Sequence, residues 1–314
     1  MDIFHDTIGF FLEPWFIAII VASIAFAAGV HIDEKLVKEQ KIGTLVTISS
    51  LFGIVLMIVF ATIAYFTEAD LNLNWERKLC AVAIGMAEIA WVIPYLYALK
   101  RRSAAVAGPM FQLIPIIGGS IEYFMGVIPP AVQVLGAILI VVGGAILSLE
   151  KGEDENGDTK HSVDWVTIAL MATSATIIAL IYVLFKDVAE SNDGYLAVGF
   201  WSGLGMLIAG FLIFSFYKPY REDFISFCKN ADREAVGYQL LNEVMDAGGA
   251  YLTHLANIIG PSVMIVTAFN ATQPIFILIF AALFSLKSGE SQEWKRAVLP
   301  IVTIAAGTVL IALQ

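Results

Sequence analysis

Residues 103–149 read SAAVAGPMFQLIPIIGGSIEYFMGVIPPAVQVLGAILIVVGGAILSL, and Glu122 is the only charged side chain in this stretch. A helix that crosses the roughly 30 Å apolar core of a bilayer needs about 20 apolar residues, so the stretch is long enough for two crossings. Pro129-Pro130 divides it, because proline has no N–H and its ring clashes with a preceding helical turn. We therefore expect two adjacent membrane helices, at 103–126 and 130–149.

The rest of the chain repeats this pattern of long apolar runs separated by short polar connectors. The other charge-poor runs are 14–32, 43–67, 79–99, 164–185, 194–217, 234–257, 260–286 and 297–313. Together with the two helices above, they predict an all-α membrane protein with ten transmembrane helices. The connector 218–233 mixes aromatic and charged residues, and we expect it to lie along the membrane surface.

The composition favours a membrane protein over other classes. Of the 314 residues, 59% are apolar and 15% are charged, and the mean hydropathy is +0.81. Soluble domains average about 45–50% apolar and about 25% charged residues. The net charge of −10 argues against a nucleic-acid partner, which requires a basic surface. Two cysteines and four scattered histidines predict no metal site, and no phosphate loop or cofactor motif is present.

The basic residues predict the orientation of the chain. All but three of the 18 Lys and Arg residues lie in connectors that follow odd-numbered helices, the exceptions being Arg77, Lys78 and Lys186. Cytoplasmic loops carry an excess of Lys and Arg, so the bias places both termini outside. We expect a multi-pass integral protein of the cell membrane, inner or plasma.

The sequence also indicates an internal repeat. Ser103–Pro115 and Ser262–Pro274 share the same spacing from serine to proline, and the last predicted helix of each half is rich in small residues. The polar linker 151–163 separates a first five-helix repeat, 1–150, from a second, 164–314. Because five is an odd number, the two repeats would be inverted relative to each other, as in many secondary transporters.

These features resemble the EamA-type transporters of the drug/metabolite transporter superfamily. The similarity is carried by Tyr97–Ala104 (Tyr-Ala-Leu-Lys-Arg-Arg-Ser-Ala), by Pro115 and by Gly143-Gly144. The resemblance implies ten helices in two inverted repeats around a central cavity, lined by the first four helices of each half. The chain differs in its Gly-Glu pair, which is Gly126-Val127 in the first half and is displaced to Gly289-Glu290 in the second. Family members also usually keep both termini in the cytoplasm, opposite to the charge bias here.

Four carboxylates fall inside the predicted helices beyond their first residues, and no Lys or Arg lies near a helix centre. A carboxylate at the bilayer centre costs about 2.5–3.5 kcal/mol on insertion scales, so such groups usually face a cavity or a partner. Helical spacing places Glu88, Trp91 and Tyr95 on one face, and Glu243 and Asp246 on another polar stripe. We expect the proton- or substrate-binding residues to be Glu88, Glu243, Asp246, Trp91, Tyr95, Gln112, Tyr123, Glu122, Asn242, Tyr251, Asn270 and Gln273.

The sequence therefore predicts a secondary active transporter that moves a small polar or amphiphilic metabolite by alternating access, and the buried acids allow proton coupling. An acidic, aromatic cavity without Lys or Arg favours an amine, a neutral amino acid, a nucleoside or a drug-like cation over a phosphorylated sugar. The alternatives are an intramembrane enzyme or lipid-processing protein, for which no catalytic cluster is visible, and an accessory subunit. The acids themselves could instead only hydrogen-bond neighbouring helices.

Overall fold

The structure is a computed structural model that describes residues 12–101, 108–148, 165–189, 192–231, 233–270 and 293–312, together with Thr272, Gln273, Ile275, Phe276 and Ile279. Some predicted features fall outside the described residues. They are the linker 151–163, the start of the fourth predicted helix at 103–107, Pro274 and the Gly289-Glu290 pair.

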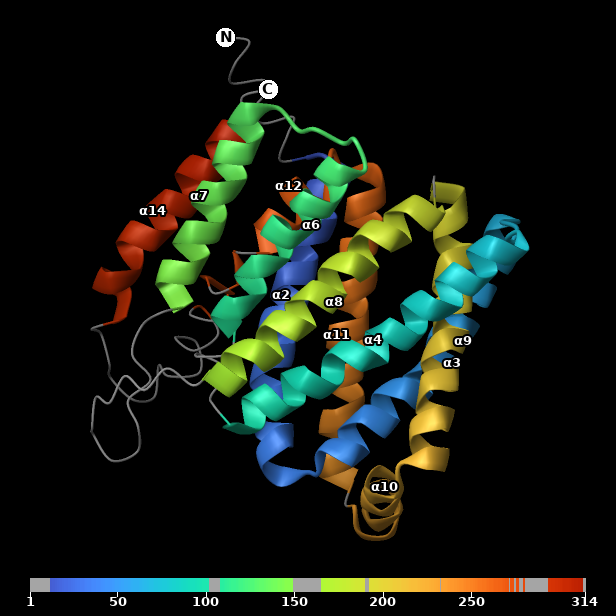
Figure 1. Cartoon of the computed structure of the whole chain (residues 1–314). Coiled ribbons are helices and arrows are strands. Elements are labelled where there is room, and N and C mark those ends of the chain that lie inside the picture. Colours follow the sequence, from blue (N-terminus) through green and yellow to red (C-terminus); the bar gives the residue numbers. More distant parts are fainter. Residues whose placement is uncertain are drawn as a thin grey trace.

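Every regular element in these ranges is a helix, as the apolar runs predict (Figure 1). The helices are α2 (Pro14–Glu39), α3 (Ile42–Thr67), α4 (Trp75–Arg101), η1 (Gly108–Gln112), α6 (Leu113–Phe124), α7 (Ala131–Ser148), α8 (Trp165–Ala189), α9 (Asn192–Phe216), α10 (Lys218–Asn230), α11 (Arg233–Ile259), α12 (Val263–Asn270) and α14 (Glu293–Ala312).

Five of these helices, α2, α3, α4, α8 and α9, are long and apolar enough to cross a membrane. Helices α7 and α14 contain shorter apolar segments, Ala131–Gly143 and Ile301–Ile311. Helix α11 has 27 residues, about 40 Å at 1.5 Å per residue, but it is more polar because it buries groups such as Gln239, Glu243 and His254. Five of the ten predicted crossings thus correspond to candidate spans, and the other five stay predictions.

Two segments differ locally from the expected helices. The predicted span 103–126 is described as the 3-10 helix η1 followed by α6, with Pro115 in the first turn of α6, where a missing N–H is tolerated. The connector 218–233 contains a further helix, α10, which begins with Lys218-Pro219 and packs against α3 and α9. Prolines near helix starts thus mark the boundaries in both segments.

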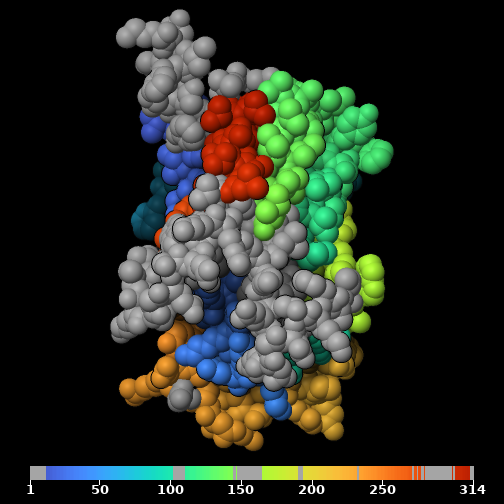
Figure 2. Space-filling view, turned by 90° about the vertical axis from the view of Figure 1, so that its left-hand side faces the viewer, coloured from blue at the N-terminus to red at the C-terminus, as the bar shows by residue number. Residues whose placement is uncertain are grey.

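The helices pack mainly across the two halves of the chain rather than within either half. Helix α2 packs along α11, α3 along α9, α4 along α8 and α9, α6 against α12, and α7 along α14. Contacts among α2, α3 and α4 are sparse. Figure 2 shows α14 in red beside α7 in green at one end of the molecule, and the gold and orange region around α10 at the other. The interior is therefore formed between the halves.

Glycines allow α7 and α14 to approach closely. A Cβ atom on Gly136 would lie 2.7 Å from the carbonyl oxygen of Gly307, and one on Gly307 would lie 2.5 Å from the carbonyl oxygen of Gly136. Side chains at these positions would force the helices apart, and small residues are the usual means of close helix packing in lipid. The outward faces of the bundle are apolar, with Ile58 of α3 and Phe211 of α9 exposed by 60% and 69%.

Candidate functional site

Two neighbouring cavities lie between helices of both halves. The first has a volume of about 770 Å³, part of it open to solvent, and is lined by residues of α2, α4, η1, α6, α8, α11 and α12. The second has a volume of about 690 Å³, also partly open, and is lined by residues of α2, α3, α4, α9 and α11. The residues that line both are Asp33, Glu88, Trp91, Tyr95, Asp246 and Ala250. The cavities therefore meet at a wall that contains three carboxylates.

Asp33 of α2 is the centre of a hydrogen-bond chain that joins three helices. Tyr95 of α4 donates its hydroxyl to Asp33 Oδ2 at 2.8 Å, and Asn242 of α11 donates Nδ2 to Asp33 Oδ1 at 2.9 Å. The same Asn242 nitrogen donates to Asp246 Oδ2 at 3.0 Å. The amide nitrogen of Asn242 thus links the Asp33 carboxylate of α2 to the Asp246 carboxylate of α11.

The sequence interpretation missed Asp33 because it ended the first helix at residue 32, before the charged residues. The helix continues to Glu39, and Asp33 is buried on its inner face. The signal was available in the spacing, since Asp33 lies three and seven residues after the inward-facing Val30 and Phe26 of the same helix.

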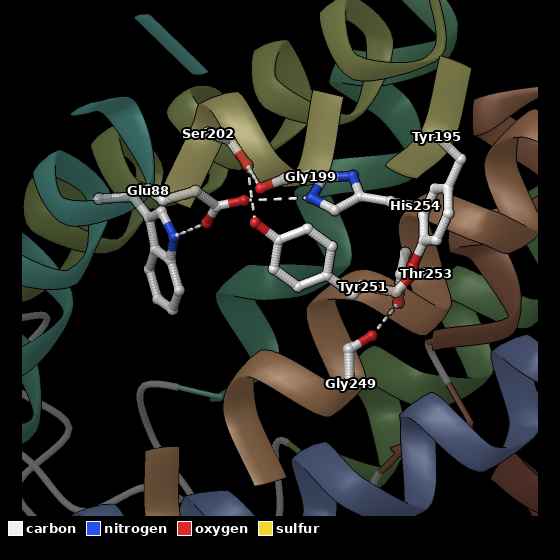
Figure 3. A network of polar contacts seen from close by, with 9 residues as sticks. Glu88, Tyr195, Gly199, Ser202, Gly249, Tyr251, Thr253 and His254 are labelled. Carbon is white, nitrogen blue, oxygen red and sulfur yellow. Dashed lines mark hydrogen bonds and ion pairs between the residues drawn. The ribbon is translucent and has the colours of Figure 1, made fainter. Parts of the chain in front are cut away.

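Glu88 connects α4 to α11 through His254. The Glu88 Oε1 atom lies 3.1 Å from His254 Nε2, and Trp91 donates its indole N–H to Glu88 Oε2 at 2.9 Å. Figure 3 shows the Glu88 carboxylate and the His254 ring pointing toward each other, with Ser202 above and Tyr251 below the line between them in this view. The hydroxyls of Ser202 and Tyr251 are 2.7 Å apart. The His254 ring stacks on a neighbouring aromatic side chain of α8, Phe185, with ring centroids 3.9 Å apart.

Glu243 lines only the second cavity. Its Oε1 atom accepts hydrogen bonds from the Ser49 hydroxyl of α3 at 2.7 Å and from Gln239 Nε2 at 2.8 Å. Glu243 is therefore the polar link between α3 and α11, two helices that otherwise make few contacts.

Aromatic and amide side chains complete the first cavity. The ring centroids of Trp91 and Tyr95 lie 5.6 Å apart, and those of Tyr95 and Phe111 lie 5.4 Å apart. The amide side chains in its lining are Gln112, Asn270 and Gln273. No Lys or Arg is among the described residues that line either cavity. In the same described part of the chain, no three His, Cys, Asp or Glu side chains are arranged to hold a metal ion.

All but two of the residues expected in the site line one or both cavities. The exceptions are Glu122 and Tyr123 near the end of α6. Glu122 is buried and accepts hydrogen bonds from the backbone N–H groups of Val263, at 2.8 Å, and Met264, at 3.1 Å, with Lys186 Nζ 3.8 Å away. Tyr123 is 61% exposed. Glu122 thus caps the start of α12, away from the cavities.

The fold and the site together define an integral membrane protein of apolar helices that enclose a polar, acid-lined interior. Residues 13–149 match the EamA-like transporter family, which is part of the drug/metabolite transporter superfamily. The first half of this chain is therefore similar to that transporter family, in agreement with the resemblance in the sequence.

The wider comparisons bear on the fold. A crystal structure with 16% sequence identity superposes with a TM-score of 0.67, covering 95% of this chain and 94% of that chain. At this identity, the likeness shows that the two chains share a fold over nearly their whole lengths. No curated protein sequence matches the chain.

Proposed function

We propose that the protein is a secondary active transporter that carries a small polar or amphiphilic metabolite across the cell membrane by alternating access. The observation that carries the proposal is the position of the cavities, which lie between the two halves of a helical membrane protein and share a wall with Asp33, Glu88 and Asp246. Substrate sites of inverted-repeat transporters lie at such an interface between repeats.

The packing of the helices supports an inverted repeat of ten crossings. On this proposal, α2, α3 and α4 correspond to α8, α9 and α11. Under this correspondence, the pair α2–α11 is the counterpart of the pair α8–α4. Both pairs are extensively packed. Three further pairs each join a helix to its own counterpart in the other half, and the two helices of each pair are packed together: α3–α9, α6–α12 and α7–α14.

One pair of helices is packed much more closely than its counterpart, and this difference supports alternating access. Helix α4 packs tightly along α9, where a Cβ atom on Gly85 would overlap the carbonyl oxygen of Ser202. Its counterpart, the pair α11–α3, makes few contacts, and residues of both helices line the second cavity. The conformation described here is then one of two, and the other has α3 packed on α11 and α4 separated from α9.

The acids of the site support coupling to protons. Asp33, Glu243 and Asp246 hydrogen-bond to neutral side chains, and no Lys or Arg is among the described residues that line their cavities. Buried carboxylates in such surroundings can take up and release protons near neutral pH, which makes them suited to proton transfer.

Transport by the purified protein in proteoliposomes, with a panel of amines, neutral amino acids and nucleosides, tests the proposed function. A second experiment tests the mechanism with Ser49→Cys and Gln239→Cys, placed in a chain in which Cys80 and Cys228 are replaced by serine. A short bifunctional thiol reagent that joins α3 to α11 is expected to stop transport.

The control is the same double-cysteine variant without the reagent, and its transport rate is the reference from which the effect of the cross-link is measured. Full transport by the cross-linked protein would contradict alternating access at this pair of helices. Absence of transport for every compound and every ion gradient would contradict the transport function itself.

A further inference from the structure

The wall shared by the two cavities contains more hydrogen-bond acceptors than donors. The Asn242 amide nitrogen serves both Asp33 and Asp246, and Tyr95 gives its only proton to Asp33. Asn242 is 4% exposed, yet its Oδ1 atom has no hydrogen-bond partner among the described residues. The carboxylates of Asp33 and Asp246 and the amide oxygen of Asn242 therefore lie close together, and the described side chains around them have no further N–H or O–H group to donate.

A second unpartnered acceptor lines the first cavity, whereas Asn242 lines the second. Gln112 of η1 is 7% exposed and borders the first cavity together with Asp33 and Asp246. Its Oε1 atom is buried and has no hydrogen-bond partner among the residues described. A buried acceptor left unpaired destabilises the folded protein, so a ligand that brings N–H donors would relieve this cost.

The remaining surface of the first cavity suits an apolar group attached to a positive charge. Trp91, Tyr95 and Phe111 stand in mutual ring contact along one side. Aromatic faces attract cations within about 6 Å of the ring centroid. A metal ion fits less well, because no third His, Cys, Asp or Glu of the described chain is placed with Asp33 and Asp246 to complete a ligand set.

We propose that Asp33 and Asp246 bind the ammonium group of a primary amine whose apolar body lies against Trp91, Tyr95 and Phe111. This inference rests on the proposed function and names the substrate class of the same cavity. An ammonium group carries three N–H donors, which match the two carboxylates and one of the unpartnered amide oxygens. The positive charge compensates the acids, and hydrogen bonds between charged groups are the stronger kind.

Gly29 of α2 has no side chain and leaves room for the Asp246 carboxylate in this arrangement. A Cβ atom at Gly29 would collide with Asp246 Oδ1. Any side chain there therefore has to displace the carboxylate from its position beside Asn242. The absence of a side chain at Gly29 thus allows α2 to bring Asp33 close to the acid of α11, and we assign Gly29 as a positioning residue of the site.

Binding to the purified, detergent-solubilised protein tests the proposal without any need for transport. The probes for calorimetry are 2-phenylethylamine, its neutral isostere 2-phenylethanol, and N,N,N-trimethyl-2-phenylethylammonium, which keeps the charge but has no N–H donor. We expect 2-phenylethylamine to bind at least tenfold more tightly than either of the others. Equal affinity of the amine and the alcohol, or no binding of the amine, would overturn the proposal.

Variants locate the binding. Asp33→Asn and Asp246→Asn are expected to weaken 2-phenylethylamine binding at least tenfold, and Gly29→Ala to weaken it in the same direction. The matched control is Glu39→Gln, an exposed acid at the end of α2, which should bind as the unmodified protein does. Gly29→Ala leaves both acids in place, so it still tests the site if Asp33→Asn does not fold. Unchanged affinity in Asp246→Asn and Gly29→Ala would overturn the proposal.

The same assay separates two sources of the ammonium group, a free amine and the headgroup of an ethanolamine lipid. Competition by short-chain phosphatidylethanolamine, but not by phosphatidylcholine, would support the site with a lipid as its ligand. The lack of such competition would support the site with a free amine. Because no gradient is involved, amine binding without transport in proteoliposomes would contradict only the transport function. Transport by a protein that does not discriminate the three probes would contradict only the ammonium site.

Discussion

Glu122 offers the sharpest test of how the two halves are held together. Its carboxylate belongs to α6, and it accepts hydrogen bonds from the first two backbone N–H groups of α12, with Lys186 of α8 at 3.8 Å. Only 3% of the residue is exposed. Glu122→Ala would leave two buried N–H groups without an acceptor and would remove the negative charge beside Lys186.

The expected loss follows from these contacts. A hydrogen bond to a charged group contributes about 1.5–3 kcal/mol, and two such bonds are lost. The contact with Lys186, whose side chain is 27% exposed, adds little. We therefore expect Glu122→Ala to lower the free energy of unfolding by about 3–5 kcal/mol, roughly a hundredfold or more in the ratio of folded to unfolded protein. Glu122→Gln keeps one acceptor oxygen and should lose about 2 kcal/mol.

The assay is reversible unfolding in mixed micelles, with the denaturing detergent as the variable. The control is Glu13→Gln, which also stands at the start of a helix but is exposed and makes no side-chain cap hydrogen bond; its change should stay within about 0.5 kcal/mol. A loss below about 1 kcal/mol in Glu122→Ala would refute the reasoning, since it would mean that water or another group replaces the carboxylate. Ligand binding at Asp33 and Asp246 should be retained in Glu122→Gln, because Glu122 lines neither cavity.

Three further outcomes are expected. Cys80 and Cys228 are both exposed and free, so an impermeant thiol reagent on intact cells should label Cys80 if the termini lie outside. Labelling of Cys228 with protection of Cys80 would instead place the termini in the cytoplasm. Glu243→Gln should abolish gradient-driven uptake while exchange without a gradient persists, and full gradient-driven uptake in this variant would leave Glu243 as a structural group. Gly85→Leu, at the close contact of α4 with α9, should hold the two helices apart and slow transport without removing 2-phenylethylamine binding; a transport rate equal to that of the unmodified protein would contradict the importance of this contact.

The helices could be read from the sequence because their signal is local. A run such as 43–67 needs no knowledge of its neighbours, and the structure has α3 over Ile42–Thr67. The polar stripe on α11 was also readable, since spacings of three and four residues place Asn242, Glu243 and Asp246 on neighbouring positions of a helix whatever packs beside it. Both predictions depend only on local sequence and on the 3.6-residue period of the α-helix.

Predictions that depended on a long-range partner were weaker. Asp33 looked like the start of a connector, because nothing near it in sequence reveals that Tyr95 and Asn242 lie beside it. Glu122 looked like a site residue, since an acid among apolar residues gives the same pattern whether it faces a cavity or caps another helix. Its partners, Val263 and Met264, are more than 140 residues away along the chain. Sequence alone thus identified buried acids but could not assign the surroundings of each.

The interlocked halves have a consequence for how the protein is made. The hydrogen bond between Asp33 and Asn242 spans 209 residues, and at roughly 5–20 residues per second a ribosome needs roughly 10–40 s to supply the second partner. For that time, Asp33 has neither Asn242 nor the cavity around it, so the early helices must be kept near water or a chaperone until α11 inserts. The wait is longer for α7, because its partner α14 follows α11 along the chain. A ribosome that stalls after the first half leaves helices without their packing partners, and we expect such fragments to be degraded unless the second half is supplied as a separate chain.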